Sequence, residues 1–595
     1  MSVCIQKAIR RLTDYQKKIQ RRLRLISLLR AATFFLTLAI IFAWSPGEVH
    51  LLPSLPGWLV FGFLVRWYSG IRRKENSCIN RLEYYRGQQD RSSNAWFLHK
   101  GAESQRADSK DIEELQIEKD LLLTGSYSLL SYLETRLPAG EDTLYAWMRD
   151  ALKQPDASTI QDRQNRIFSL RRLKVLQGRW YGQNRAQPVK QSSERDDRSL
   201  EKETKHAFRT VPAWLAAVAG TLALISLGAF FSHEILGTKA YHFLSFPLQW
   251  LLFGIYLLFY RNKEARQRFD ELLSSLDQTL PFLRCLQGFR FHDSHLHREQ
   301  ELTKNLRQEL RGAIVQDSFY SLFRNPLAFA LGGLLFSGPV LADWSMGGFL
   351  KKNEAKIRGW LQDFAAMDAM LSLAGHSRFL EPMCRPEIVS GNEPEVFALQ
   401  LHHPLIPAEE SVGNDLDFRK EHRLWIVTGS NMGGKSTFLR TLGMNLVLAQ
   451  MGGAVRARQF KFCPTPMVTS MQIQDNLARS ESLFYAEVRS LKRLVDHPSP
   501  VFYFLDEMLK GTNQTDRSFA CKKILSHLID SGSSGLLTTH DMELTSLKEN
   551  YGQKVQLFHF RESPGEGLQF DFKLHPGSVE GTTALTILRR EGLPV

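Results

Sequence analysis

The chain has 595 residues, of which 43% are hydrophobic and 23% are charged, and its formal net charge is +14. This composition excludes an intrinsically disordered protein, and the length exceeds what one hydrophobic core usually supports, so we expect at least two folded units. The excess of positive charge is compatible with an anionic partner, either nucleic acid or a membrane surface. The six cysteines are scattered without CxxC pairs, which argues against a zinc site and against a disulfide framework.

Four apolar stretches approach the length of about 20 residues that a helix needs to cross a bilayer. They form two pairs, 28–44 with 51–68 and 211–231 with 243–260. Basic residues precede the first member and follow the second member of each pair, which predicts two transmembrane hairpins and a multi-pass protein of the inner (cytoplasmic) membrane. The alternative is that the four stretches are buried helices of a large folded core. A fifth apolar run, 326–341, contains glycines and a proline, and we expect it to be core.

The regions between and after the hairpins are polar and show the periodicity of amphipathic helices. At 112–123 and 158–176, apolar residues recur three and four positions apart. These regions are therefore predicted to be helical and cytoplasmic.

A glycine-rich motif with the pattern GxxxxGK[ST] follows a predicted buried strand at 424–427 and precedes a predicted amphipathic helix at 438–451. Its residues are Gly429, Ser430, Asn431, Met432, Gly433, Gly434, Lys435, Ser436 and Thr437. In this setting backbone N–H groups close around the β- and γ-phosphates of a nucleotide, and the helix N-terminus adds partial positive charge. Lys435 supplies a charge to the same oxygens, and Ser436 offers its hydroxyl to Mg²⁺. The pattern predicts ATP and Mg²⁺ as ligands.

Two further apolar runs end in polar residues that suit the same chemistry. The run 501–505 ends in Asp506 and Glu507, as expected for a parallel strand that delivers carboxylates to the phosphates. Asp506 would hold Mg²⁺ through water, and Glu507 would orient or deprotonate the attacking water. The run 535–539 ends at His540, whose imidazole could sense the γ-phosphate through water. The alternatives are an acidic pair that caps a strand and a histidine with a structural role.

Four segments of the sequence resemble the ATPase domain of MutS proteins. They are TGSNMGGKSTFLRTLG at 428–443, LAQMGGAVRA at 448–457, FLDEMLKGTNQTDR at 504–517 and TTHDMEL at 538–544. The resemblance implies a homodimer whose ATPase domains sandwich the nucleotide, with Ser482 reaching across to the partner's ATP and Asn431 contacting phosphate. It also implies that 403–405 and 414–415 help to enclose the base.

The resemblance extends more weakly upstream, where 128–170 is similar to the opening of the MutS helical core. The expected fold class is an α/β P-loop NTPase domain of the ABC/MutS type at the C-terminus, preceded by an all-α core or lever domain with transmembrane hairpins. The predicted organisation is a basic N-terminal helix at 1–27, hairpins at 28–68 and 211–260, helical regions at 69–210 and 261–400, and a cytoplasmic ATPase domain at 401–595.

The expected function is ATP hydrolysis in a membrane-anchored dimer that binds DNA as MutS proteins do, with an unknown protein partner. The mismatch-reading domain of MutS, with its Phe-x-Glu wedge, has no counterpart in this sequence. Mismatch repair is therefore implied only by the resemblance to the family. An ABC-like membrane ATPase that drives transport or remodelling without DNA is the rival hypothesis, although no LSGGQ-like signature is present. A structural scaffold with a vestigial nucleotide site is a third.

Overall fold

The computed structural model describes residues 2–43, 55–92, 112–125, 127–183, 211–236, 242–260, 329–330, 332–334, 337–376, 381–391, 393–419, 421–430, 433–471, 483–510, 512–561 and 570–578, with short pieces between 271 and 296. The chain divides into two compact units. Unit 1 comprises Met1–Arg136, Gly140–Asn184 and Met367–Val595, and unit 2 comprises Leu137–Ala139 and Arg185–Ala366. Each unit is described below by itself.

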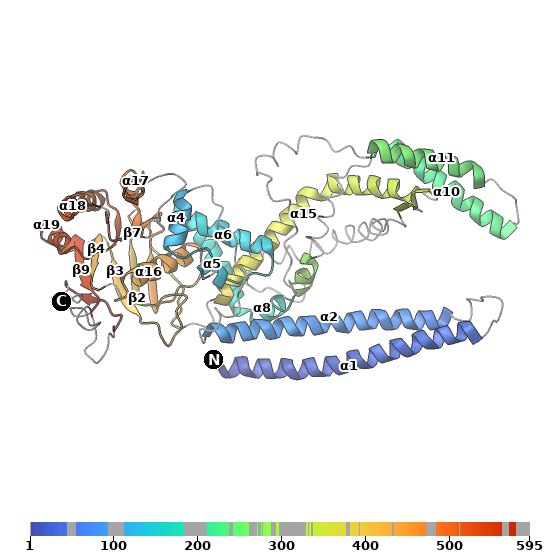
Figure 1. Ribbon diagram of the computed structural model, residues 1–595, viewed down its shortest axis with the longest axis horizontal. Helices are drawn as coiled ribbons and strands as arrows, with labels where there is room; N and C mark the ends of the chain where they lie inside the picture. Colours follow the sequence, from blue (N-terminus) through green and yellow to red (C-terminus); the bar gives the residue numbers. More distant parts are fainter. Residues whose placement is uncertain are drawn as a thin grey trace, which may run out of the picture. The chain divides into compact units, whose positions relative to one another are not determined.

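The C-terminal part of unit 1 is built around a six-stranded sheet with the strand order β10-β9-β4-β8-β7-β6. Figure 1 labels β4, β7 and β9 of this sheet. The strands are β4 (Leu424–Thr428), β6 (Met467–Ser470), β7 (Phe502–Asp506), β8 (Ser534–Thr538), β9 (Val555–His559) and β10 (His575–Pro576). All neighbouring pairs are parallel except β9 with β10. Every residue of β4 and β8 is buried, as expected for central strands that are covered on both faces. The predicted α/β domain is confirmed.

Alternating side chains of this sheet face two different cores. On one face, Leu505 of β7 joins a buried cluster with Leu491 of α17. On the other face, Phe418 stacks on Trp425 with ring centroids 4.8 Å apart and meets the edge of Phe502 at 5.2 Å. The helices of this domain are α16 (Lys435–Gln450), α17 (Leu483–Val495), α18 (Gln514–Asp530) and α19 (Leu547–Tyr551), with a 3₁₀ helix at Met542–Ser546.

Phe418 belongs to a second, four-stranded sheet with the order β1-β5-β2-β3. Its strands are β1 (Glu387–Ile388), β2 (Val396–Leu401), β3 (Asn414–Phe418) and β5 (Gln459–Phe462). β2 runs antiparallel to both β3 and β5. The aromatic contacts of Phe418 therefore pack the end of β3 against the six-stranded sheet.

A helical region precedes this α/β domain in the chain, as predicted. Its helices in unit 1 are α4 (Ile112–Asp120), α5 (Leu129–Tyr132), α6 (Pro138–Lys153), α7 (Ala157–Arg172), α8 (Lys174–Trp180) and the C-terminal part of α15 (Gly338–His376). The fully buried carboxylate of Asp368 accepts hydrogen bonds from Arg136 N at 2.8 Å and from Trp180 Nε1 at 2.6 Å. One acidic side chain of α15 thus ties together segments that are distant in the sequence.

The end of α4 is attached to the α/β domain through Asp120, which is fully buried. Its Oδ2 accepts hydrogen bonds from Thr469 Oγ1 at 2.7 Å and from Met471 N at 3.1 Å, and its backbone oxygen accepts one from Arg440 Nε at 3.0 Å. Gln116 donates to Oδ1 at 2.9 Å. Asp120 therefore links α4 to both β6 and α16.

Replacing Asp120 with Ala should lower the free energy of unfolding by about 2–5 kcal/mol, because buried donors that include the Thr469 hydroxyl and the Met471 N–H lose their acceptor. The measurement is the midpoint of urea unfolding. Asp162→Ala removes the same charge from a side chain that is 69% exposed and should shift the midpoint little. Equal shifts for the two variants would contradict the role given to Asp120.

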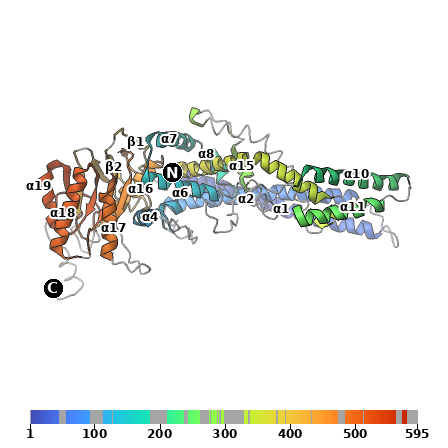
Figure 2. The ribbon, with the colours of Figure 1, turned by 90° about the horizontal axis from the view of Figure 1, so that it is seen from above.

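The N-terminal helices α1 (Ser2–Ala43) and α2 (Leu55–Ser92) lie side by side in both views of the molecule (Figures 1 and 2). Ile19, Leu23 and Ile26 of α1 are buried against Leu64 and Ile71 of α2. Their spacing of three and four residues gives α1 an apolar stripe that faces α2. This two-helix core begins within the segment predicted as the basic N-terminal helix.

The second predicted hairpin corresponds to α10 (Ala213–Leu236), α11 (His242–Ile255) and the π-helix Tyr256–Tyr260 in unit 2. Leu215 and Ala219 of α10 form a buried cluster with Phe253, Tyr256 and Val340. Val340 lies in the fifth apolar run, which was expected to be core.

The predicted transmembrane hairpins and the multi-pass location in the inner membrane are wrong. Within the described part of the chain, no helix combines the length and the apolar character needed to cross a bilayer. Arg30 and Arg66 interrupt the first two predicted spans. Some apolar residues of the other stretches, such as Leu64 and Leu215, belong to the helix–helix cores above, whereas others, such as Leu258, are exposed. The turns at 44–54 and 237–241 lie outside the described residues.

Candidate active site

The glycine-rich motif forms the connection from β4 to α16. Gly429 has a φ of +130°, and a Cβ atom at this position would lie 2.6 Å from the backbone oxygen of Phe560. Gly434, the N-cap of α16, has a φ of +99°. Both positions require glycine, because L side chains disfavour these conformations and because Gly429 has no room for a Cβ. The motif therefore presents a loop and a helix N-terminus suited to phosphate. Asn431 and Met432 lie outside the described residues.

Lys435 is the first residue of α16, and its side chain points back into the loop. Only 3% of Lys435 is exposed. Its Nζ donates hydrogen bonds to the backbone oxygens of Gly429 at 2.6 Å and Ser430 at 3.1 Å, and it lies 3.0 Å from His540 Nε2. Burial lowers the pKa of Lys435 to about 8, although the carboxylates of Glu507 and Asp506 act in the opposite direction.

This pKa predicts that ATP binding weakens as the pH rises. Below pH 8 the free protein already carries the Lys435 charge, whereas above pH 8 a proton must be taken up when the phosphates bind. The dissociation constant for ATP should therefore rise by about tenfold between pH 7 and pH 9, one proton being linked to binding. Titrations with a fluorescent ATP analogue across this range would measure the change. In Lys435→Arg the dependence should disappear because a guanidinium stays charged, and its persistence would show that another group titrates.

The next residue, Ser436, meets the acidic end of β7. Its Oγ donates a hydrogen bond to Asp506 Oδ2 at 2.6 Å, and the Thr538 hydroxyl at the end of β8 donates to Asp506 Oδ1. A hydroxyl and a carboxylate oxygen at this spacing are the kind of donors that Mg²⁺ accepts alongside water and phosphate oxygens. No cluster of three or more His, Cys, Asp or Glu side chains suited to a metal occurs among the described residues. By their chemistry, Ser436 and Asp506 are the residues that would hold Mg²⁺.

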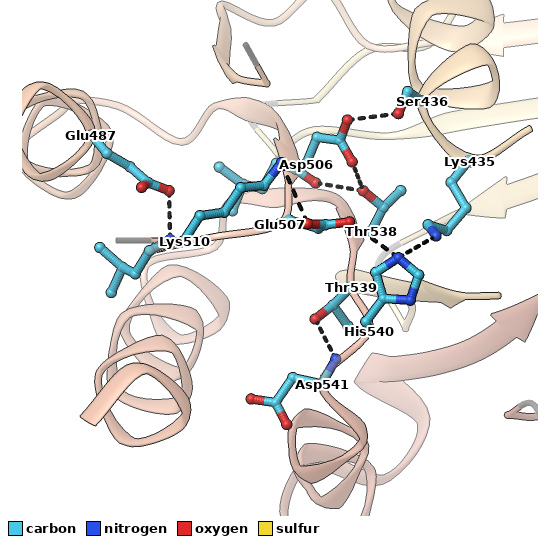
Figure 3. A network of polar contacts seen from close by, with 12 residues as sticks. Lys435, Ser436, Glu487, Asp506, Glu507, Lys510, Thr538, Thr539, His540 and Asp541 are labelled. Atoms are coloured by element: carbon cyan, nitrogen blue, oxygen red, sulfur yellow. Dashed lines mark hydrogen bonds and ion pairs between the residues drawn. The ribbon is translucent and has the colours of Figure 1, made fainter. Parts of the chain in front are cut away.

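Glu507 follows β7 and has a φ of +55°. Its backbone N–H donates to Thr538 O at 2.9 Å, which continues the pairing of β7 with β8 by one residue. Its carboxylate lies 3.4 Å from Lys510 Nζ and 3.2 Å from His540 Nε2 (Figure 3). The side chain is 29% exposed and so remains accessible to water.

His540 occupies a position between the lysine and the glutamate. Its Nε2 contacts both Lys435 Nζ and Glu507 Oε1 (Figure 3). Burial lowers the pKa of His540, and the neighbouring Lys435 charge lowers it further. A neutral imidazole can accept from Lys435 or donate to Glu507 through this nitrogen, but not both at once. His540 is thus a polar bridge across the site in the absence of nucleotide.

A cavity of about 680 Å³ opens beside the loop, a volume suited to a nucleotide. Gly434, Lys435, Ser436 and Thr437 are among the residues that line it. Its lining also includes His403, Leu405 and Asn414, which belong to the segments expected to enclose the base, together with Phe560 and Phe572.

Two of these wall residues were not predicted from the sequence. Phe572 has a φ of +52°, and a Cβ at Gly434 would lie 3.2 Å from its ring. Asn414 fixes it by donating to Phe572 O at 3.0 Å and by accepting from Leu574 N at 2.8 Å. Phe560 donates its backbone N–H to Thr428 at 3.1 Å. No motif of the sequence indicated either phenylalanine as a residue of the cavity wall.

Most of the predicted site residues meet at one edge of the six-stranded sheet. The structure places together Gly429, Ser430, Gly433, Gly434, Lys435, Ser436, Thr437, Asp506, Glu507 and His540. Ser482, like Asn431 and Met432, lies outside the described residues, so its predicted position across a dimer interface stays a prediction. The chain becomes described again at Leu483, where α17 begins.

Comparison with known proteins relates this domain to a family. Residues 425–595 match the family model of MutS domain V. The DNA mismatch repair protein MutS of Sorangium cellulosum (strain So ce56) is 31% identical over 253 residues, which cover 41% of this chain and 27% of that protein. The chain thus matches about a quarter of the length of this curated relative. The C-terminal domain is a P-loop ATPase-type α/β domain preceded by a helical region, and both matches support the predicted relation to MutS proteins.

Proposed function

We propose that the chain is a MutS-family ATPase that hydrolyses ATP with Mg²⁺ at the loop between β4 and α16. One observation carries this proposal: the ends of three neighbouring parallel strands bring Lys435, Ser436, Asp506, Glu507 and His540 within hydrogen-bond or ion-pair distance of one another. Phosphate chemistry needs a cation, metal ligands and a water-orienting carboxylate in this arrangement.

Each side chain then has one task. Lys435 binds the β- and γ-phosphate oxygens in place of the carbonyls of Gly429 and Ser430. Ser436 and Asp506 hold Mg²⁺, which when bound supplies positive charge to the phosphates. Glu507 orients the attacking water and accepts its proton, and His540, released from Lys435, can contact the γ-phosphate side of the site.

The assembly is proposed as a homodimer with two nucleotides between the ATPase domains, in which Ser482 of each copy completes the site of the other. The support is the similarity to MutS domain V. In this arrangement closure around ATP and reopening after hydrolysis would move the helical region. Light scattering with and without ATP would test whether the mass doubles.

We also propose that the protein binds DNA. Two observations support this: the relative named above is a DNA mismatch repair protein, and the net charge of +14 suits an anionic partner. It concerns the helical region, which lies outside the matched domain. Its test is a titration against duplex, branched and mismatched DNA at two salt concentrations, because phosphate contacts must give salt-dependent affinity. Negligible binding at both concentrations would remove DNA from the proposal.

The test of the ATPase itself is phosphate release from ATP by the purified full chain. The rate should depend on Mg²⁺ and should fall to background when EDTA is added, because Ser436 and Asp506 then have no ion to hold. If the rate of phosphate release were the same with and without Mg²⁺, Ser436 and Asp506 could not have the proposed role of metal ligands.

A further inference from the structure

We propose that Glu487 is a positioning residue for Glu507: its buried carboxylate holds the turn after β7 and so couples α17 to the carboxylate that orients water. This inference deepens the proposed ATPase function and rests on it. Glu487 belongs to none of the sequence motifs that predicted the site.

The geometry that supports it is a contact between a helix and a turn. Glu487 lies in the second turn of α17 and is 8% exposed. Its Oε1 accepts a hydrogen bond from the backbone N–H of Leu509 at 2.5 Å (Figure 3). Burial raises the pKa of the Glu487 carboxyl, while the backbone N–H groups of both Leu509 and Lys510 lower it. The carboxylate therefore holds the backbone of the turn at Leu509.

That turn needs such support because its conformation is unfavourable. Glu507 and Leu509 have φ values of +55° and +56°, in the left-handed region that L residues rarely adopt. Met508 and Leu509 are buried in the core cluster of α17 and α18, which fixes the side chains of the turn. The Glu487 carboxylate fixes its backbone.

The conformation of this turn determines where the Glu507 carboxylate lies. Glu507 is its first residue, and Lys510, its last, pairs with Glu507 Oε2 at 3.4 Å. If the backbone at 509–510 lost its acceptor, the turn could relax out of the left-handed region, and both the Glu507 side chain and its Lys510 partner would shift. A shift of about 1 Å at a water-orienting group is enough to slow a reaction by about 100-fold.

Two substitutions of similar size separate the acceptor from the packing. Glu487→Met removes the acceptor and keeps the volume, whereas Glu487→Gln keeps an acceptor oxygen. We expect Glu487→Met to lower kcat by about 10- to 100-fold with the Kd for ATP within about twofold of the parent, and Glu487→Gln to stay within about threefold in kcat. Ser490→Ala, at another buried polar residue of α17, is the control for general disturbance of the helix and should match the parent.

A purely structural role predicts a different pattern, in which Glu487→Met weakens ATP binding and lowers kcat together. Combining Glu487→Met with Glu507→Gln provides the second readout. If Glu487 acts through Glu507, the double variant should be no slower than Glu507→Gln alone. Additive losses, or parent-like kcat in a folded Glu487→Met protein with Lys435-dependent hydrolysis, would overturn this inference while leaving the ATPase intact. Absence of Lys435-dependent hydrolysis in the parent would instead defeat the proposed function.

Discussion

Replacing Lys435 with Ala should reduce ATP hydrolysis to background, a loss of at least about 100-fold, and should weaken ATP binding as well. The buried ammonium is held at the loop by two backbone oxygens and lies against His540, so it is positioned for phosphate before any nucleotide binds. Its loss removes positive charge from a site that contains Asp506 and Glu507, which then repel the triphosphate. The measurement is phosphate release under saturating Mg²⁺ and ATP, together with an equilibrium binding titration.

The matched control is Lys461→Ala, which removes an equal charge from β5, where Lys461 pairs with Glu387 at 2.8 Å. This pair is partly exposed and contributes little to stability, so activity should be unchanged. Hydrolysis by Lys435→Ala at the rate of the parent would show that the reaction does not occur at this loop.

Replacing Glu507 with Gln should lower kcat by about 100- to 10,000-fold while ATP binding persists. The amide keeps the shape of the side chain but cannot accept a proton from water, and it no longer repels the γ-phosphate. The contrast with Lys435→Ala is the informative feature, since one variant should bind without turnover and the other should bind poorly. Single-turnover hydrolysis and nucleotide retention after gel filtration would separate the two.

Glu549→Gln serves as the control for Glu507, because Glu549 is an exposed residue of α19 with the same change in charge. It should turn over ATP at the rate of the parent. If Glu507→Gln did the same, the carboxylate that orients water would have to be sought elsewhere in the site.

The nucleotide site was predictable from the sequence because its residues follow buried strands. The run before Gly429 and the run before Asp506 are continuous and apolar, and parallel strands place their carboxyl ends at one edge. Spacing between motifs, in contrast, carried no information about side-chain contacts. The bridge formed by His540 Nε2 and the left-handed φ of Glu507 depend on tertiary packing.

The sequence was sufficient to predict that this part of the chain is helical, but not what surrounds the helices. A long apolar run has the same composition whether its surroundings are lipid or another helix, so length and flanking charge could not distinguish them. The buried contacts that these helices make, such as Leu64 with Ile26 and Val340 with Leu215, join residues that are far apart in the sequence. Asp120 and Asp368 were missed for a related reason, since a single acidic residue in a polar helix does not reveal that it is buried.

The Lys435 ammonium contacts three groups of the protein, and these contacts affect how tightly different nucleotides bind. Before binding, its ammonium already has two carbonyl oxygens and an imidazole as neighbours, so an incoming ligand must exchange these contacts for new ones. A triphosphate brings enough oxygen atoms to compensate for that exchange, whereas a diphosphate brings fewer and a monophosphate fewer still. We therefore expect the protein to bind ATP more tightly than ADP.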